Sequence, residues 1–315
     1  MDTRRTVALA RGQAIDHQGA VVESVDPDFS LEPTIFAIVA KQSPFFIAEM
    51  LRRQLARVPH WADAALSAFR SETVPAAPPI DTRITDFMLN ECNFKMEHAD
   101  GSFMDHVAFC HDYCAAYYKG HSPRVLLLHS ILGVGTNIFP MEVGKLSQLS
   151  ALVNETEMRH IEAFPSVLRL LVGSRLLADL RERLGDMDKL KQVSFRRVID
   201  NKPLELDADD FWVQLNYQVI HLIDFLPVAE WAARVSEPLF QVFLELRTLL
   251  GAANQLQAKV DIGATCVAPP VEAQLLSSAA SSPMGIIKRS QAKTSVRKFS
   301  AQIGHSLDYT LHWKD

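Results

Sequence analysis

Residues 122–133 read SPRVLLLHSILG, and this stretch decides the kind of fold that the chain can adopt. Ser122 followed by Pro123 is a typical helix start, because the serine side chain caps the first turn and proline has no N–H to satisfy there. The run 125–132 is apolar on nearly every side, apart from His129. A helix of this kind is central and buried, although a buried strand is an alternative interpretation.

Helical spacing of apolar residues continues on both sides of this segment, which is expected to end at Gly133. Further helices are predicted around 103–117, 142–152, 155–172, 174–184, 207–226 and 236–260, whereas 193–206 looks irregular or extended. Pro165 is expected to kink or divide the helix that contains it. The sequence therefore predicts a mainly α protein with a single large helical domain at 31–260 and a proline-rich linker at 72–81.

The two ends of the chain differ from this domain in composition. Residues 1–30 are polar and predict an irregular arm, and residues 261–315 predict a polar, partly basic tail. Apolar and polar residues alternate from Leu307 to Lys314, which is the pattern of a half-buried strand. Because a lone strand leaves its backbone groups unpaired, this strand must pair either with the arm or with the sheet edge of a partner protein.

Composition limits the classes of function. The 315 residues include 32 basic and 37 acidic side chains, so the formal charge of −5 gives no strong indication of nucleic-acid binding. No apolar run approaches the ~20 residues of a transmembrane helix. The four cysteines form no CxxC pair and indicate reduced core thiols, which predicts a cytoplasmic protein. Three early arginines, Arg4, Arg5 and Arg11, make a mitochondrial location the alternative.

Histidines carry the main chemical indication. His106 lies beside the apolar stripe of its predicted helix, and His129 is embedded in the most apolar segment of the chain. His221 is one helical turn from Asp224 and shares a helix face with Tyr217. A buried imidazole needs a partner, which a metal ion, a carboxylate or a backbone carbonyl supplies. The pattern is therefore compatible with a metal site or with satisfied core histidines.

This arrangement resembles the HD-domain superfamily, an all-helical group that includes metal-dependent phosphohydrolases and the myo-inositol oxygenase type of di-iron enzyme. The segment around His129 is similar to the family's His-Asp segment, and 220–224 looks like its last ligand segment. The resemblance implies an orthogonal helical bundle and a divalent metal such as Fe, Mn or Zn. It implies His106, His129 and Asp224 as ligands, with His160 as a fourth candidate.

The sequence departs from the family at Ser130, where the family has its aspartate. A hydroxyl is a much poorer ligand than a carboxylate, so a one-metal site or a metal-free relative of the fold is expected instead of a two-metal centre. Ser130, His221 and Tyr217 are then expected around the ligands, with His221 as a proton carrier.

Two functions follow from these observations. The first is a non-catalytic helical interaction or assembly protein, possessing a degenerate HD-like core and binding a protein partner through its tail. The expected contact residues are Lys288, Arg289, Lys293, Arg297, Lys298, Tyr309 and Trp313. The second is a metal-dependent hydrolase or oxygenase with an atypical His/Asp site.

Overall fold

The computed structural model describes residues 77–94, 97–98, 101–133, 135, 137, 139–223, 238–260 and 282–314. The predicted arm at 1–30, the first part of the predicted linker and Asp224 lie outside the described residues. Within them the protein is mainly α, as the sequence predicts. None of the described helices is both long and apolar enough to cross a membrane.

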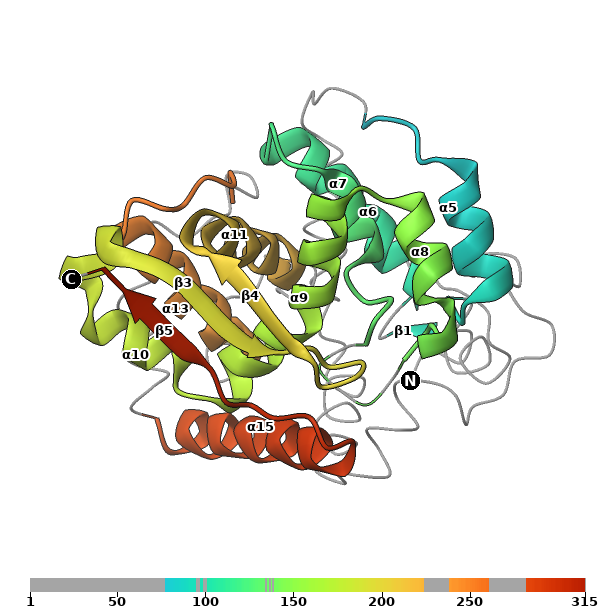
Figure 1. Cartoon of the computed structure of the whole chain (residues 1–315). Helices are drawn as coiled ribbons and strands as arrows, with labels where there is room; N and C mark the ends of the chain where they lie inside the picture. Colours follow the sequence, from blue (N-terminus) through green and yellow to red (C-terminus); the bar gives the residue numbers. More distant parts are fainter. Residues whose placement is uncertain are drawn as a thin grey trace, which may run out of the picture.

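Most of the described chain is helical, and Figure 1 shows the arrangement. The longer helices are α6 (Phe103–Tyr117), α9 (Glu155–Gly173), α11 (Ala208–Ile223), α13 (Pro238–Ala252) and α15 (Pro283–Gln302). The shorter ones are α5 (Thr82–Asp86), the π-helical turn η1 (Phe87–Glu91), α7 (Pro123–Leu128), η2 (Val143–Lys145), α8 (Leu146–Leu152), α10 (Leu176–Glu182) and η3 (Leu184–Lys189). A short antiparallel hairpin precedes α6, and its strands β1 (Glu97–His98) and β2 (Gly101–Ser102) have two residues each.

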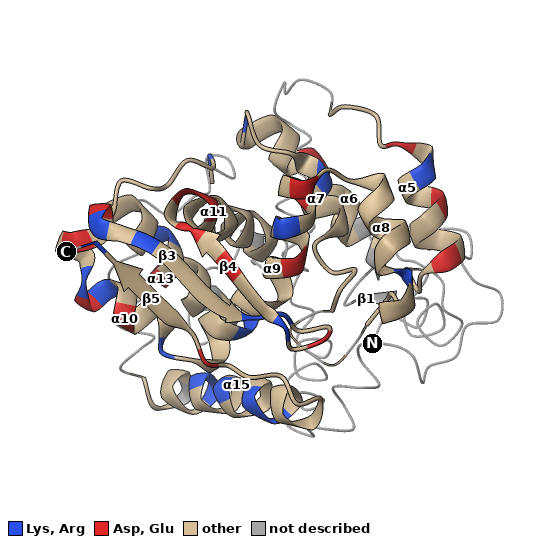
Figure 2. Cartoon of the chain, viewed as in Figure 1, with Lys and Arg blue, Asp and Glu red and all other residues tan. Residues whose placement is uncertain are grey.

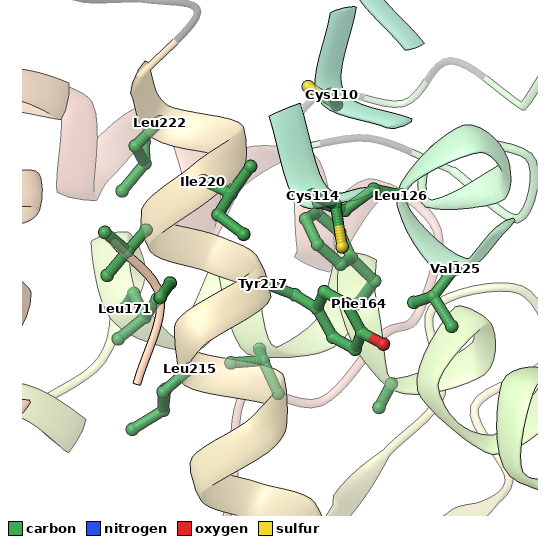
Figure 3. Close-up of a cluster of buried hydrophobic side chains, with 14 of the residues drawn as sticks. Cys110, Cys114, Val125, Leu126, Phe164, Leu171, Leu215, Tyr217, Ile220 and Leu222 are labelled. Atoms are coloured by element: carbon green, nitrogen blue, oxygen red, sulfur yellow. The ribbon is translucent and has the colours of Figure 1, made fainter. Parts of the chain in front are cut away.

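The hydrophobic core lies where α6, α7, α9 and α11 meet, and part of it is drawn in Figure 3. Leu126 of α7, Phe164 of α9 and Ile220 of α11 are almost completely buried there. The predicted central segment is indeed part of this core, since every residue from 125 to 132 is buried. Close packing of these apolar side chains holds the helices that carry the histidines.

The α-helix of the central segment is shorter than predicted. It ends at Leu128, and residues 129–132 form turns closed by bonds such as that from the Gly133 amide to the Ser130 carbonyl. The imidazole of His129 contacts the Leu126 carbonyl oxygen, which an uninterrupted helix would offer to the Ser130 amide. The side chain thus competes with the backbone at the point where the helix stops.

Helix α9 begins with a capping box. The Asn154 side chain accepts from the Glu157 amide, and the Glu157 carboxylate accepts from the Asn154 amide, so two otherwise unpaired amides are satisfied. Pro165 was expected to kink or divide this helix, and division is wrong, because α9 continues through it as one element. Helix α13 ends at Ala252, earlier than the predicted 260, and the left-handed conformation of Asn254 follows.

The extended region predicted near 193–206 is an antiparallel hairpin of β3 (Leu190–Arg196) and β4 (Pro203–Asp207). The predicted terminal strand is present as β5 (Thr310–Trp313), and it pairs with β3, where Val193 is opposite Leu311. Among the described residues the partner of this strand is therefore the hairpin of the same chain, which neither expectation named. The sheet order is β4-β3-β5, and the sheet packs against α11.

Part of the predicted tail from 261 onward is built into the fold, because residues 283–302 form the 20-residue helix α15, which the sequence did not predict, and the predicted strand is present as β5. Helix α15 packs against α9 so closely that a Cβ added at Gly173 would lie 2.9 Å from Val296 Cγ1. The fully buried Arg169 donates to the Ser300 hydroxyl at 3.2 Å, and burial lowers its pKa to about 10. This helix is therefore part of the folded domain.

Candidate metal centre

Three histidines from three different elements converge in the core. His106 lies on α6, His129 directly follows α7, and His221 lies in the last turn of α11. One ring nitrogen of each lies within 4.8 Å of the corresponding nitrogens of the other two. Their exposed fractions are 5%, 1% and 6%, so all three imidazoles are shielded from bulk water.

The rings meet edge to face instead of stacking. Their centroids are 5.0 Å apart for His106 and His129, 5.2 Å for His106 and His221, and 4.7 Å for His129 and His221. Phe164 of α9 contacts two of them, with its ring centroid 4.7 Å from that of His129 and 5.2 Å from that of His221. The fourth helix of the core thus supplies an apolar wall that limits how these rings can turn.

The hydrogen bonds define which nitrogens carry protons. His129 Nδ1 lies 2.6 Å from the Leu126 carbonyl oxygen, which can only accept, so Nδ1 carries the proton and Nε2 has a free lone pair. His129 Nε2 lies 3.2 Å from His106 Nε2, which must therefore donate to it. The backbone contact fixes His129 in the tautomer that metal-binding histidines adopt when Nε2 is the ligand.

Burial favours the uncharged forms of His106 and His129. It lowers the pKa of His106 to about 3, because the charged form would lose its hydration. Burial also lowers the pKa of His129 well below its usual range, and the nearby His106 adds to this effect. Neutral imidazole is the form that binds metal ions. At neutral pH neither His106 nor His129 is an imidazolium that must first be deprotonated.

His160 lies apart from this cluster. Its Nδ1 is 3.1 Å from Gln214 Oε1, and its Nε2 is 3.4 Å from Asp210 Oδ1. Asp210 also accepts from Arg159 at 2.6 Å, and the hydrogen bond from His160, followed by that from Arg159, lowers the pKa of Asp210 to about 2. The structure thus gives His160 partners in a separate polar network and does not bring it to the other ligands.

The remaining residues expected around the ligands have different positions. Ser130 is buried beside His129 in the turn after α7. Tyr217 is buried on α11, where its hydroxyl donates to the Ser122 carbonyl at 3.1 Å and its ring contacts His160. Burial raises the pKa of Tyr217 above its usual value. Asp224 directly follows the last described residue of α11, so its predicted role as a ligand lies outside the described residues.

His221 has a position that differs from the one predicted for it. The sequence placed it beside the ligands, whereas the structure puts its ring in the cluster itself. A signal was present, because His106, His129 and His221 are each an imidazole within or beside an apolar helical stretch. That pattern indicates burial of all three, and buried imidazoles need partners.

Several predicted contact residues of the tail bind this chain's own core. Arg289 lies 3.3 Å from Glu245 and donates to the Pro238 carbonyl, and Arg297 donates to the Gly173 carbonyl at 3.0 Å. Tyr309 donates to Asp179, and the Arg183 guanidinium lies 5.0 Å from the centre of the Trp313 ring. Lys288 is half-buried on α15, Lys293 is half-buried, and Lys298 is exposed.

Comparison with known proteins gives no relative for this chain: no family model matches it, and no curated protein or solved structure is significantly similar to it. Function is therefore inferred from the geometry of the residues themselves.

Proposed function

We propose that this protein binds one divalent transition-metal ion through His106, His129 and His221. The observation that carries the proposal is the convergence of three ring nitrogens within 4.8 Å, on elements that are separated by 23 or more residues of sequence. An ion held there would join α6, the turn after α7 and α11, and so couple metal binding to the stability of the core.

The distances fit this class of ligand. Two nitrogens that bind one tetrahedral ion at ~2.0–2.1 Å lie roughly 3.3 Å apart, and His106 Nε2 and His129 Nε2 are 3.2 Å apart. His221 is within the same group and needs a small ring movement to reach an equal distance. Imidazole donors favour zinc, iron, copper or nickel over magnesium and calcium, which prefer oxygen. Zinc and iron(II) are therefore the expected ions.

The resemblance to the HD-domain superfamily supports two of the three ligands. It implied His106 and His129, and the proposal replaces the expected carboxylate by His221. A three-imidazole set with Ser130 beside it favours a single ion, because the carboxylate that bridges two metals in that family has no counterpart at this position. Three protein ligands leave a coordination position open, and an ion bound there would polarise a water or substrate oxygen. This makes metal-dependent hydrolysis the proposed reaction class.

Cobalt(II) titration of the purified full-length chain tests the proposal, because Co²⁺ reports four-coordinate nitrogen ligands by its visible absorption. The wild-type protein is expected to bind one equivalent, and His129→Ala and His221→Ala are expected to bind none. His312→Ala is the matched control, since His312 is an exposed imidazole on β5 and its loss should leave one equivalent bound. Circular dichroism of each variant without metal shows whether it has folded.

The proposal fails if the wild-type protein binds no stoichiometric Co²⁺ or Zn²⁺ after removal of excess metal by gel filtration. It also fails if folded His129→Ala and His221→Ala bind as much as the wild type. If both variants are unfolded without metal, the wild-type protein decides the question. It should bind one equivalent, lose it to a chelator, and keep its helical circular dichroism after the metal is removed.

A further inference from the structure

Helix α15 exposes a face that carries basic residues and no acid. From residue 273 to residue 307 the chain has no aspartate or glutamate, and α15 supplies all five lysines and arginines of that stretch. Figure 2 shows these basic residues along the length of the helix. A helix face with one sign of charge attracts a segment of opposite charge.

Part of this charge already has partners within the domain, and part does not. Arg289 is close to Glu245, and Arg297 donates to the Gly173 carbonyl. Lys293 and Lys298 form no ion pair with a described carboxylate. Burial lowers the pKa of Lys293, and the neighbouring Arg297, Arg175 and Arg289 lower it further, so cations gather at this point of the surface. An added carboxylate would relieve that repulsion.

The same face also exposes large apolar side chains. Ile286 and Ile287, in the first turns of α15, are 55% and 48% exposed. On a 3.6-residue helix their positions lie on the same side as those of Lys298 and Arg297, whereas Val296 and Phe299 point into the core. The surface therefore has an apolar end and a basic end, and a fitting segment combines apolar residues with acids.

The chain contains a segment of that composition. Residues 12–40 have no lysine or arginine, and five acids: Asp16, Glu23, Asp26, Asp28 and Glu32. Apolar residues lie between and after these acids, among them Val21, Val22 and Phe29. A second acid-only stretch at 203–233 is for the most part already built into β4 and α11. Charge complementarity thus favours 12–40 as the segment that fits α15.

We infer that the acidic segment 12–40 binds in cis to the exposed face of α15, with its carboxylates at Lys293 and Lys298 and its apolar side chains at Ile286 and Ile287. The distance along the chain allows this contact. The 36 residues from 41 to 76 span about 54 Å even at the helical rise of ~1.5 Å per residue, which is comparable to the diameter of a domain of this size. The contact does not depend on the metal centre.

Carbodiimide cross-linking of the full-length chain tests the inference, because this reagent joins only a lysine amine and a carboxylate that are in direct contact. Cross-links from Lys293 or Lys298 to acids within 12–40 are expected. Lys145 and Glu91 are the internal positive control, since their charged atoms lie 3.1 Å apart across 54 residues of sequence. A mixture of ¹⁴N- and ¹⁵N-labelled chains distinguishes links within one chain from links between two.

A second measurement uses the rate of lysine acetylation in the full-length chain. Neutralising Glu23→Gln, Asp26→Asn, Asp28→Asn and Glu32→Gln together is expected to raise the rate at Lys293 and Lys298 about threefold or more, the size of effect that loss of exposed ion pairs produces. Lys314 is the control, since it is an exposed lysine that directly follows β5 and lies outside α15, so its rate should not change.

The inference is overturned if Lys145–Glu91 links form but Lys293 and Lys298 link only to acids outside 12–40, or to none. It is equally overturned if the links are of mixed isotope, since the contact would then join two chains. Unchanged acetylation of both lysines in the neutralised variant also contradicts it.

Discussion

His106 Nε2 and His129 Nε2 lie 3.2 Å apart in the core, although 23 residues separate them in the sequence. In the absence of an ion this contact is a hydrogen bond from one neutral ring to the other, and His221 completes the group. The His129 Nε2 lone pair that accepts this hydrogen bond is the one that would bind a metal ion, and His106 Nε2 would have to give up its proton to bind the same ion. Metal binding and the stability of this contact are therefore linked, and the linkage can be measured.

Zinc is expected to stabilise the wild-type protein against heat. An ion that binds only the folded state adds RT ln(1 + [Zn²⁺]/Kd), which is about 2.7 kcal/mol when free zinc is 100 times Kd. Tm should rise by several degrees with zinc and return with a chelator, followed by circular dichroism. His221→Ala should show no such rise, whereas His312→Ala should behave like the wild type. Equal shifts in all three proteins would place zinc at some other site.

Gly173→Ala is expected to lower the free energy of unfolding by about 1–3 kcal/mol, because its methyl group would overlap Val296 of α15. Urea unfolding measures this change. Gly251→Ala is the matched control, since nothing lies within 4 Å of a Cβ there and alanine favours the helix. Val296→Ala in the Gly173→Ala background should recover part of the loss. If the losses in unfolding free energy of the two single variants simply add in the double variant, the proposed clash is contradicted.

Asp210→Asn is expected to make stability less dependent on pH. The pKa of Asp210 is lowered to about 2 by hydrogen bonds from His160 and Arg159, so its charged form stabilises the folded state above the ordinary pKa of about 4. That contribution, about 1–2 kcal/mol at pH 7, is lost as pH falls toward 2. Urea unfolding of the wild type and the variant should therefore differ at pH 7, and the difference should narrow by about half at pH 3. The exposed Asp209→Asn is the control, and a difference for Asp210→Asn that is constant with pH would refute the assignment.

Asn216→Ala is expected to destabilise the protein by about 2–4 kcal/mol, because its buried amide makes four hydrogen bonds. Asn216 Oδ1 accepts two of these bonds, from the Gln257 and Ala258 amides, and so ties the segment after α13 to α11. Chemical denaturation gives the loss, and hydrogen exchange should speed up at Gln257 and Ala258 before the core exchanges. Asn90→Ala, at an exposed position, should change stability by less than about 0.5 kcal/mol.

The sequence by itself determined the helical class and much of the core. The apolar spacing of 103–117 and the run 125–132 are local patterns, and both segments are buried in the structure. The terminal strand also follows from a local pattern, since alternation fixes the extended conformation of 310–313. Burial of His129 was predictable for the same reason, because its neighbours on every side are apolar.

Only the tertiary structure decided which distant residues meet. Periodicity gives the face of a helix on which a side chain lies, and it contains no information about the neighbour of that face. His221 therefore joins His106 and His129. His160 instead pairs with Gln214 and Asp210, because the packing of α9 against α11 brings these side chains together. The pairing of β5 with β3 and the docking of α15 on Gly173 depend in the same way on contacts between segments more than 100 residues apart, which no local pattern specifies.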